Sequence, residues 1–143
     1  MKEQVVLFVC VHNSGRSQMA EALTNSLARN AGIGVCAISA GTVGGKALNP
    51  AAVIAMEEIG ISMAGHVPKL ITQEMVDCAD RIISMGCGVD AVACPARFIL
   101  TEDWGLDDPA GESIDKVREV RQAIHKHVDA LLLNILNSRA SSP

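Results

Sequence analysis

The sequence contains very few aromatic residues and no cluster of basic residues. Aromatic residues make up 2% of the 143 residues, with two Phe, one Trp and no Tyr, and the formal net charge is −4. Nucleic-acid-binding proteins present a basic face, and single-strand binders stack bases on aromatic rings. The composition therefore argues against a nucleic-acid partner. It also predicts a core built mainly from aliphatic side chains.

Long apolar runs are also absent. No stretch approaches the roughly 20 residues that a membrane-spanning helix needs. The first residues, Met1–Gln4, include an acid and precede only five apolar residues, which is too little for a signal peptide. We therefore expect a cytoplasmic protein without membrane contact. In a reducing compartment, the five cysteines are expected to be catalytic, metal-binding or buried rather than joined in structural disulfides.

What is present is a regular alternation of strand and helix patterns along one domain, residues 1–143. It predicts a three-layer α/β/α fold with a four-stranded parallel sheet, whose ligands bind at the carboxyl ends of the strands. A polar loop is predicted over Glu102–Glu112. The predicted strands are Val5–Val9, Val35–Ala40, Arg81–Met85 and Arg97–Leu100, and the predicted helices are Ser17–Asn30, Asn49–Ile59, Thr72–Cys78 and Ser113–Leu136.

Cys10 stands at the end of the first predicted strand, and a short loop joins it to the first predicted helix. The N–H groups of such a loop and the helix N-terminus attract an oxyanion, and the same field lowers the pKa of the Cys10 thiol. The planar fork of Arg16 can bridge two anion oxygens. A buried core cysteine is the simpler alternative for Cys10, but the strand–loop–helix context favours nucleophilic attack on a bound oxyanion. The predicted oxyanion-binding loop consists of Val11, His12, Asn13, Ser14, Gly15, Arg16 and Ser17.

Cys87 and Cys94 form a second candidate site, flanked by Gly86 and Gly88. Three interpretations stay open for the pair: two buried thiols, half of a zinc site, or a redox relay. The close C-x2–4-C spacing and the histidine partners of a zinc site are missing. A relay fits better once Cys10 is accepted as a nucleophile, because such thiols work with resolving cysteines. The remaining cysteines, Cys36 and Cys78, are predicted to be small buried residues.

Asp108 is the third candidate. An acidic loop is usually a solvated turn. Beside a sulfur–oxyanion site, however, an aspartate can protonate a departing oxygen. Pro109 restricts the backbone of Asp108 and helps to present its carboxyl group. Cys10, Cys87 and Asp108 all follow predicted strands, so we expect them at one edge of the sheet.

These motifs resemble a known family. The loop Cys10–Ser17 after a strand, with Asp108-Pro109 near the last helix, looks like the low-molecular-weight protein tyrosine phosphatase fold. Cys87, Cys94 and the run Asp103–Gly111 resemble the thioredoxin-coupled arsenate reductases built on that fold. The segments Ser17–Ala22, Ser39–Gly41 and Asn49-Pro50 also match.

The resemblance implies a mechanism and its partners. Cys10 attacks the arsenic of arsenate, Arg16 and the loop hold the oxyanion, and Asp108 protonates the departing oxygen. Cys87 then attacks Cys10, arsenite leaves, and Cys94 attacks Cys87. Thioredoxin reduces the resulting disulfide, so no cofactor is bound. Phosphate or sulfate can mimic arsenate, and we expect a monomer.

The chain departs from the family at three places. The family often has Gly and Cys where His12 and Gly15 stand here. Some members bind a potassium ion with an aspartate from the segment that here contains Lys69. We hypothesise that Lys69 replaces this cation or abolishes its site. The other residues that match the potassium site are Asn13, Glu21 and Ser39.

Three alternatives remain open at this level. The first is a protein tyrosine phosphatase or another phosphomonoesterase, which needs neither Cys87 nor Cys94. The small pair Ala110-Gly111 after Asp108-Pro109 argues against an aryl substrate, although weak phosphatase activity is expected. The second is a reductase coupled to another thiol carrier. The third is a module that binds the anion or senses redox state without turnover.

Overall fold

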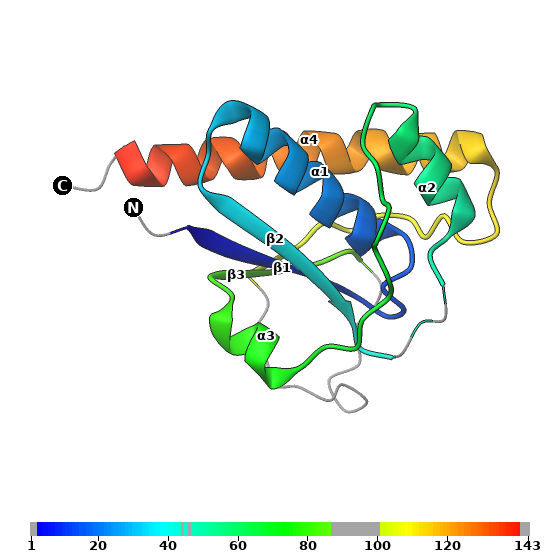
Figure 1. The fold of residues 1–143 in the computed structure, drawn as a ribbon, viewed down its shortest axis with the longest axis horizontal. Helices are drawn as coiled ribbons and strands as arrows, with labels where there is room; N and C mark the ends of the chain where they lie inside the picture. Colours follow the sequence, from blue (N-terminus) through cyan, green and yellow to red (C-terminus); the bar gives the residue numbers. More distant parts are fainter. Residues whose placement is uncertain (1–2, 44, 46, 87–100, 141–143) are drawn as a thin grey trace.

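The computed structural model describes residues 3–43, 45, 47–86 and 101–140, which form a parallel sheet with helices on both faces (Figure 1). The sheet has the order β2-β1-β3-β4, and each neighbouring pair is parallel. Helices α1, α2 and α4 cover one face and α3 lies on the other (Figure 1). The predicted three-layer fold with four parallel strands is confirmed. The elements are β1 (Gln4–Cys10), α1 (Arg16–Ala31), β2 (Val35–Gly41), α2 (Pro50–Glu57), α3 (Gln73–Cys78), β3 (Arg81–Ser84), β4 (Glu102–Asp103) and α4 (Ile114–Ala140).

The central strand β1 separates two apolar clusters, which are mainly aliphatic. Val6 and Phe8 belong to the larger cluster, under α1, α2 and α4, while Leu7 and Val9 belong to the smaller one, under α3. The alternation follows from the period of two in a strand. Because both faces of β1 are covered, Cys10 ends the strand in a buried position, with 4% of its surface exposed. The aliphatic core expected from the composition is confirmed.

The fourth strand differs from the sequence prediction. Residues 97–100, predicted as a strand, lie outside the described residues. The described fourth strand is β4, Glu102–Asp103, which pairs with Ile83 and Ser84 of β3 in a stretch that we predicted as loop. Both β4 residues are exposed and neither is apolar, so the strand pattern had no signal there. Pairing with the edge of β3 forms this strand, not intrinsic propensity.

Helix α1 begins at Arg16, one residue earlier than predicted, so Ser17 lies within its first turn. Gly15 occupies the N-cap position and makes no side-chain capping bond. The Ser17 hydroxyl is fully buried and faces Cys10 and Asn13. At the other end of the chain, α4 runs past its predicted end at Leu136 to Ala140.

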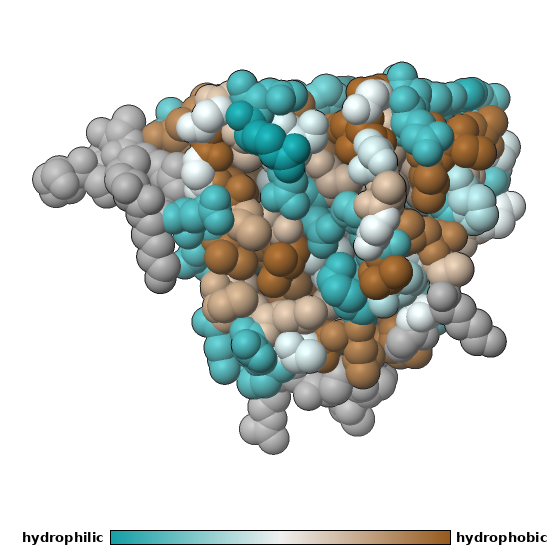
Figure 2. All heavy atoms as spheres, viewed as in Figure 1, coloured by the Kyte–Doolittle hydropathy of each residue, from teal (hydrophilic) through white to brown (hydrophobic). Residues whose placement is uncertain are grey.

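The surface mixes polar and apolar residues. Figure 2 shows apolar residues in separate patches between polar ones on the face that carries α1 and α2. Exposed apolar side chains include Ile54, Val67 and Leu70. Such scattered residues are normal on a folded domain. Among the described helices, none combines the length and the apolar character needed to cross a membrane.

Candidate active site

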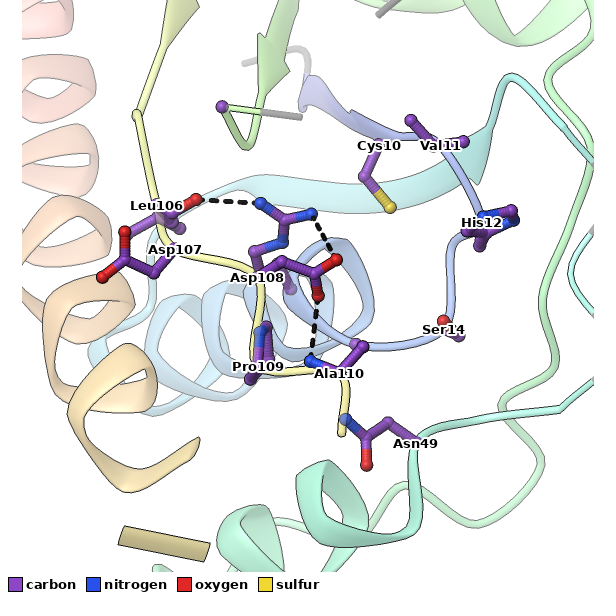
Figure 3. A pocket seen from close by; sticks show the side chains of 13 residues that line it. Cys10, Val11, His12, Ser14, Asn49, Leu106, Asp107, Asp108, Pro109 and Ala110 are labelled. Atoms are coloured by element: carbon purple, nitrogen blue, oxygen red, sulfur yellow. Dashed lines mark hydrogen bonds and ion pairs between the residues drawn. The ribbon is translucent and has the colours of Figure 1, made fainter. Parts of the chain in front are cut away.

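A cavity of about 480 Å³ lies where β1 ends and α1 begins (Figure 3). We call residues 10–17 the anion loop and residues 105–110 the acid loop. These two segments supply most of its walls, with Asn49 before α2 and Gly86 after β3. The site lies at the carboxyl ends of β1 and β3, as expected for a parallel sheet. The lining residues are Cys10, Val11, His12, Ser14, Gly15, Arg16, Asn49, Gly86, Leu106, Asp107, Asp108, Pro109 and Ala110.

The sulfur of Cys10 lies among hydrogen-bond donors. The backbone N–H of Asn13 donates to Sγ at 3.1 Å, and Ser17 Oγ lies 2.9 Å from Sγ. Asn13 Nδ2 donates to the same Ser17 oxygen at 2.8 Å, which leaves the hydroxyl hydrogen free to point at the sulfur. Hydrogen bonds donated to sulfur, and the N-terminus of α1, stabilise a thiolate over a thiol. The loop is therefore arranged for a nucleophilic sulfur.

Arg16 joins the anion loop to the acid loop. Its side chain is 9% exposed, and Nη1 donates to the backbone oxygens of Leu106 at 2.8 Å and Met85 at 3.2 Å. Nη2 lies 3.7 Å from Asp108 Oδ2 (Figure 3). These contacts fix the guanidinium beside the cavity. Its remaining hydrogens can be shared with a bound oxyanion. The two carbonyl partners of Arg16 are functional groups that the sequence did not indicate.

The two aspartates of the acid loop point in different directions. In Figure 3 the carboxyl group of Asp108 points toward the part of the cavity where the Cys10 sulfur lies, whereas Asp107 points away. Asp108 Oδ1 accepts a hydrogen bond from Ala110 N at 3.0 Å, and its side chain is 64% exposed. Asp107 pairs with Lys116 at 2.7 Å, and this hydrogen bond lowers the pKa of Asp107. Asp108 thus has the placement that a proton donor needs.

A further aspartate fixes the start of the acid loop. Asp103 Oδ1 accepts hydrogen bonds from Ser84 Oγ at 2.8 Å and from Gly105 N at 3.3 Å. The Ser84 hydrogen bond is the largest cause of a lowered pKa for Asp103. Trp104, next along the chain, is buried and stacks on His127 with ring centroids 4.8 Å apart. The acid loop therefore starts from a firmly held residue pair.

Gly86 closes one wall of the cavity. Its φ is +80°, and a Cβ there would lie 2.7 Å from Gly105 Cα and Leu106 N. Only glycine allows this approach of the chain to the acid loop. Cys87 is the next residue in the sequence, but Cys87 and Cys94 both lie outside the described residues. Of the predicted catalytic residues, the structure thus brings together Cys10, Arg16 and Asp108.

Behind the anion loop, a buried glutamine fixes Asn13. Gln18 is fully buried, and its Nε2 donates to Asn13 Oδ1 and Val67 O, both at 2.8 Å, and to Asn13 O at 3.2 Å. Its Oε1 lies 2.9 Å from His66 Nδ1. Among the described residues, Asn13 is the only non-glycine residue with positive φ, at 55°. Gln18 belongs to the predicted helix, but nothing in the sequence indicated its contact with His66.

The residues that match the potassium site contact one another or Lys69. Glu21 Oε1 accepts a hydrogen bond from Ser39 Oγ at 2.9 Å and lies 3.5 Å from Lys69 Nζ. The Asn13 Oδ1 atom already accepts from Lys69 N, at 2.9 Å, in addition to Gln18. Within residues 3–43, 45, 47–86 and 101–140, no group of three or more His, Cys, Asp or Glu could hold a metal ion.

The other two described cysteines lie outside the cavity. Cys36 of β2 is half-buried, and burial, followed by the charge of Glu3, raises the pKa of its thiol. Cys78 is exposed, so its predicted burial is wrong. It is the last residue of α3, a short helix that buries none of its residues fully. Cys10 is thus the described cysteine with the environment of a nucleophile.

Comparison with known proteins gives consistent matches over nearly the whole chain. Residues 5–141 match the family described as low molecular weight phosphotyrosine protein phosphatase. The chain is 36% identical over 134 residues to a glutaredoxin arsenate reductase of Synechocystis. The aligned region covers 91% of this chain and 97% of the relative.

Several solved structures are similar in fold and sequence. One is an arsenate reductase in the phosphate binding state, with TM-score 0.77 and 35% identity over 92% of this chain and 98% of that one. Another is a thioredoxin-dependent arsenate reductase of Corynebacterium glutamicum, with TM-score 0.76 and 33% identity over 96% of this chain and 64% of that one.

Proposed function

The chain belongs to the low molecular weight phosphotyrosine protein phosphatase family, and from that premise we propose that it is an arsenate reductase. One observation carries the proposal. Cys10, Arg16 and Asp108 line a single cavity whose wall includes Gly86, and the sequence continues from Gly86 directly to Cys87. A nucleophile, an anion-binding cation, an acid and a first resolving thiol are thus close in space or in sequence. Relatives named arsenate reductase support the same activity.

Substrate binding uses the anion loop. Arsenate is a tetrahedral oxyanion, and the loop N–H groups and the N-terminus of α1 stabilise its negative charge. Arg16 supplies a planar fork that remains anchored to Leu106 O while it contacts the anion. Phosphate and sulfate have similar shape and charge and compete for the site. The neighbouring arsenate reductase solved in a phosphate binding state supports this expectation.

The first chemical step forms a bond between the Cys10 sulfur and arsenic. The Cys10 thiolate supplies the electron pair, an arsenic–oxygen bond breaks, and Asp108 gives its proton to the departing oxygen, which leaves as water. Arsenic stays in its +5 state. The donors from Asn13 and Ser17 keep the sulfur ionised until it attacks.

The redox step transfers two electrons to arsenic. The Cys87 thiolate attacks the Cys10 sulfur, a disulfide bond forms, and the arsenic–sulfur bond breaks with its electron pair left on arsenic. Arsenic leaves in the +3 state as arsenite. Cys94 then attacks the Cys87 sulfur, which releases Cys10 as a thiolate and leaves a Cys87–Cys94 disulfide.

An external dithiol reduces that disulfide and restores the enzyme. We propose thioredoxin, because a second resolving cysteine produces an intramolecular disulfide that a carrier dithiol can open by exchange. The Corynebacterium neighbour is described as a thioredoxin-dependent arsenate reductase, whereas the Synechocystis relative is described as a glutaredoxin arsenate reductase. Both carriers therefore belong in the test. The scheme needs no bound cofactor, works in a monomer and requires a reducing compartment such as the cytoplasm.

Lys69 bears on ion dependence. We propose that its ammonium group takes the place of a monovalent cation, since Nζ lies 3.5 Å from Glu21 Oε1. Turnover of the wild-type chain should then be independent of added potassium, while Lys69→Met should lose activity and regain part of it in potassium. Clear stimulation of the wild-type chain by potassium would contradict this role.

Phosphomonoester hydrolysis is the alternative within the same family. It would use Cys10, Arg16 and Asp108 but neither of the other two cysteines. The acid loop places the small side chain of Ala110 in the cavity wall directly after Pro109, where an aryl substrate would need an aromatic side chain to pack against its ring. We expect only slow hydrolysis of small phosphomonoesters.

The decisive assay measures arsenite produced and NADPH consumed. Wild-type chain is supplied with thioredoxin and thioredoxin reductase, or with glutaredoxin, glutathione and glutathione reductase. Multiple turnover is expected with thioredoxin, and Cys87→Ser and Cys94→Ser should abolish it. Cys78→Ser is the matched control, because this thiol is exposed and lies outside the cavity.

Turnover that survives in both resolving-cysteine variants would rule out the relay. Faster turnover with glutaredoxin would replace thioredoxin as the partner. If neither carrier supports arsenite production, and the chain hydrolyses phosphomonoesters efficiently at a rate that Cys87→Ser does not change, the function is that of a phosphatase.

A further inference from the structure

We propose that Gln18 and His66 are positioning residues that set the reactivity of the Cys10 thiol from behind the anion loop. The inference rests on the Cys10 nucleophile of the proposed function, but it concerns the ionisation of that thiol and not the fate of arsenate. The two residues lie 48 positions apart in the sequence and meet through a hydrogen bond of 2.9 Å.

The first step concerns the orientation of the Gln18 amide. Three acceptors surround Nε2, namely Asn13 O, Asn13 Oδ1 and Val67 O. A flipped amide would place Oε1 against all three oxygens, so only one orientation is allowed. In this orientation Oε1 is buried and needs a donor. His66 Nδ1 is that donor, because its neighbours, Gln18 Oε1 and Glu21 Oε2, are both acceptors.

The second step concerns what Gln18 holds. Asn13 adopts a left-handed conformation, which is disfavoured for a residue with a side chain. The hydrogen bonds from Gln18 to Asn13 O and Oδ1 hold both the backbone carbonyl and the side-chain amide of Asn13 in that conformation. There the Asn13 N–H points at Cys10 Sγ and its Nδ2 points at Ser17 Oγ. Loss of the Gln18 contacts lets the loop relax and weakens both donors to sulfur.

The third step concerns what holds His66. Glu21 Oε2 lies 3.2 Å from His66 Nδ1, and the other carboxylate oxygen of Glu21 contacts Ser39 Oγ and Lys69 Nζ. The His66 side chain is 21% exposed and that of Glu21 is 12% exposed. The charged groups that face His66 are therefore Glu21 and, through it, Lys69. A continuous series of hydrogen bonds runs from His66 through Gln18 and Asn13 to the sulfur, and the Glu21 carboxylate contacts the His66 end of this series.

The side-chain amide of asparagine provides a conservative replacement for His66. Its Nδ2 can donate from about the position of the histidine Nδ1, whereas leucine fills a similar space without a donor. Gln18→Met likewise keeps the volume of the glutamine and removes its hydrogen bonds. His125→Leu is the matched control, because His125 is half-exposed on α4 and contacts Asp129 instead.

The experiment measures the pH dependence of Cys10 alkylation by iodoacetamide, read by mass spectrometry of the Cys10 peptide. The whole 143-residue chain with Cys87→Ser and Cys94→Ser is used, so that neither resolving cysteine reacts with Cys10. We expect Gln18→Met and His66→Leu to raise the pKa of Cys10 and to slow its alkylation about tenfold at pH values below that pKa. His66→Asn and His125→Leu should keep the original profile. Alkylation of Cys78 in the same samples should not change.

The charged and titratable groups around the cavity, Arg16, His12, Asp107 and Asp108, are the same in every variant. Unchanged Cys10 profiles in folded Gln18→Met and His66→Leu would overturn the proposal. A His66→Asn profile that matches His66→Leu would overturn it as well. If Gln18→Met does not fold, the two His66 variants still decide. Alkylation needs no arsenate, so this result is independent of whether the chain reduces arsenate.

Discussion

The two walls of the cavity differ in how firmly the protein holds them. The anion loop is held from behind, although His12 on it is exposed: Asn13 and Ser17 are fully buried and bonded to each other, and Gln18 supports Asn13. On the acid loop, the side chains of Asp107 and Asp108 are 73% and 64% exposed. Arg16 is the direct bridge between them. The difference suggests that the nucleophile and anion cradle are preorganised, while the proton donor is held by fewer contacts and remains open to solvent.

The largest predicted effect comes from the sulfur on the buried wall. Cys10→Ser should lower arsenite production below detection, since a serine hydroxyl cannot form the disulfide that reduces arsenic. Binding of phosphate or arsenate, measured by calorimetry, should persist because the loop N–H groups and Arg16 remain. Residual arsenite production in the purified variant would show that another group starts the reaction, and loss of all anion binding would show that the loop had collapsed.

The bridge between the walls should give the next largest effect. Arg16→Lys keeps a positive charge but loses the fork that reaches Leu106 O and the cavity at once. We expect kcat/KM for arsenate to fall about 10²–10³-fold. A loss under tenfold in steady-state kinetics would mean that a point charge is enough and that the bridging geometry has no catalytic value.

The exposed wall should be more tolerant than the buried one. Asp108→Asn removes the proton donor, and we expect kcat to fall about 10²-fold. Asp107→Asn is the matched control, because the Asp107 carboxyl group points away from the Cys10 sulfur and pairs with Lys116. The kcat of this variant should change less than twofold. Equal losses in rapid-quench measurements of the two variants would remove the distinction between these aspartates.

Close approach of the walls can be tested through stability. Gly86→Ala adds a Cβ 2.7 Å from the acid-loop backbone at a φ of +80°. We expect the free energy of unfolding in urea to fall by about 3 kcal/mol. Gly111→Ala has the same kind of positive φ, at +73°, with nothing within 4 Å, and should cost only about 1 kcal/mol. Similar losses of unfolding free energy in the two variants would show that a Cβ at position 86 does not clash with the acid loop.

The smallest effect concerns acid pH. Folding lowers the pKa of Asp103 below its ordinary value of 3.8, chiefly through the Ser84 hydrogen bond. A lowered carboxyl pKa stabilises the fold above that ordinary value, and the stabilisation disappears as pH falls below it. Asp103→Asn should therefore lower the melting temperature slightly at pH 6 and not at pH 2 to 3. A larger deficit in acid than at pH 6 would reverse the assigned sign.

The sequence reveals features that are contiguous and misses those that depend on distant contacts. The Cys10 loop could be predicted because strand, loop and helix follow one another within 20 residues of the N-terminus. Asp108 could be predicted from Pro109 and its place after a strand. The contact of Gln18 with His66 spans 48 positions and has no local pattern.

The wrong predictions also have physical causes. Ser17 is predicted as the first residue of its helix, but α1 begins at Arg16 and the Ser17 hydroxyl contacts Asn13 and Cys10. Cys78 was expected to be buried from its residue type alone, yet it ends a short surface helix. In β4 the chain pairs through its backbone, so Glu102 and Asp103 carry no strand pattern. In each case a tertiary contact outweighs local preference.

The central claim is that arsenate oxidises Cys10 and Cys87 to a disulfide while it is reduced. The direct measurement is a single turnover of reduced Cys94→Ser with arsenate and no carrier, followed by disulfide mapping and arsenite quantification. We predict one arsenite per chain and a trapped Cys10–Cys87 disulfide. Arsenite formed without that disulfide would contradict the account. So would the release of unreduced arsenate with Cys10 and Cys87 both still present as thiols.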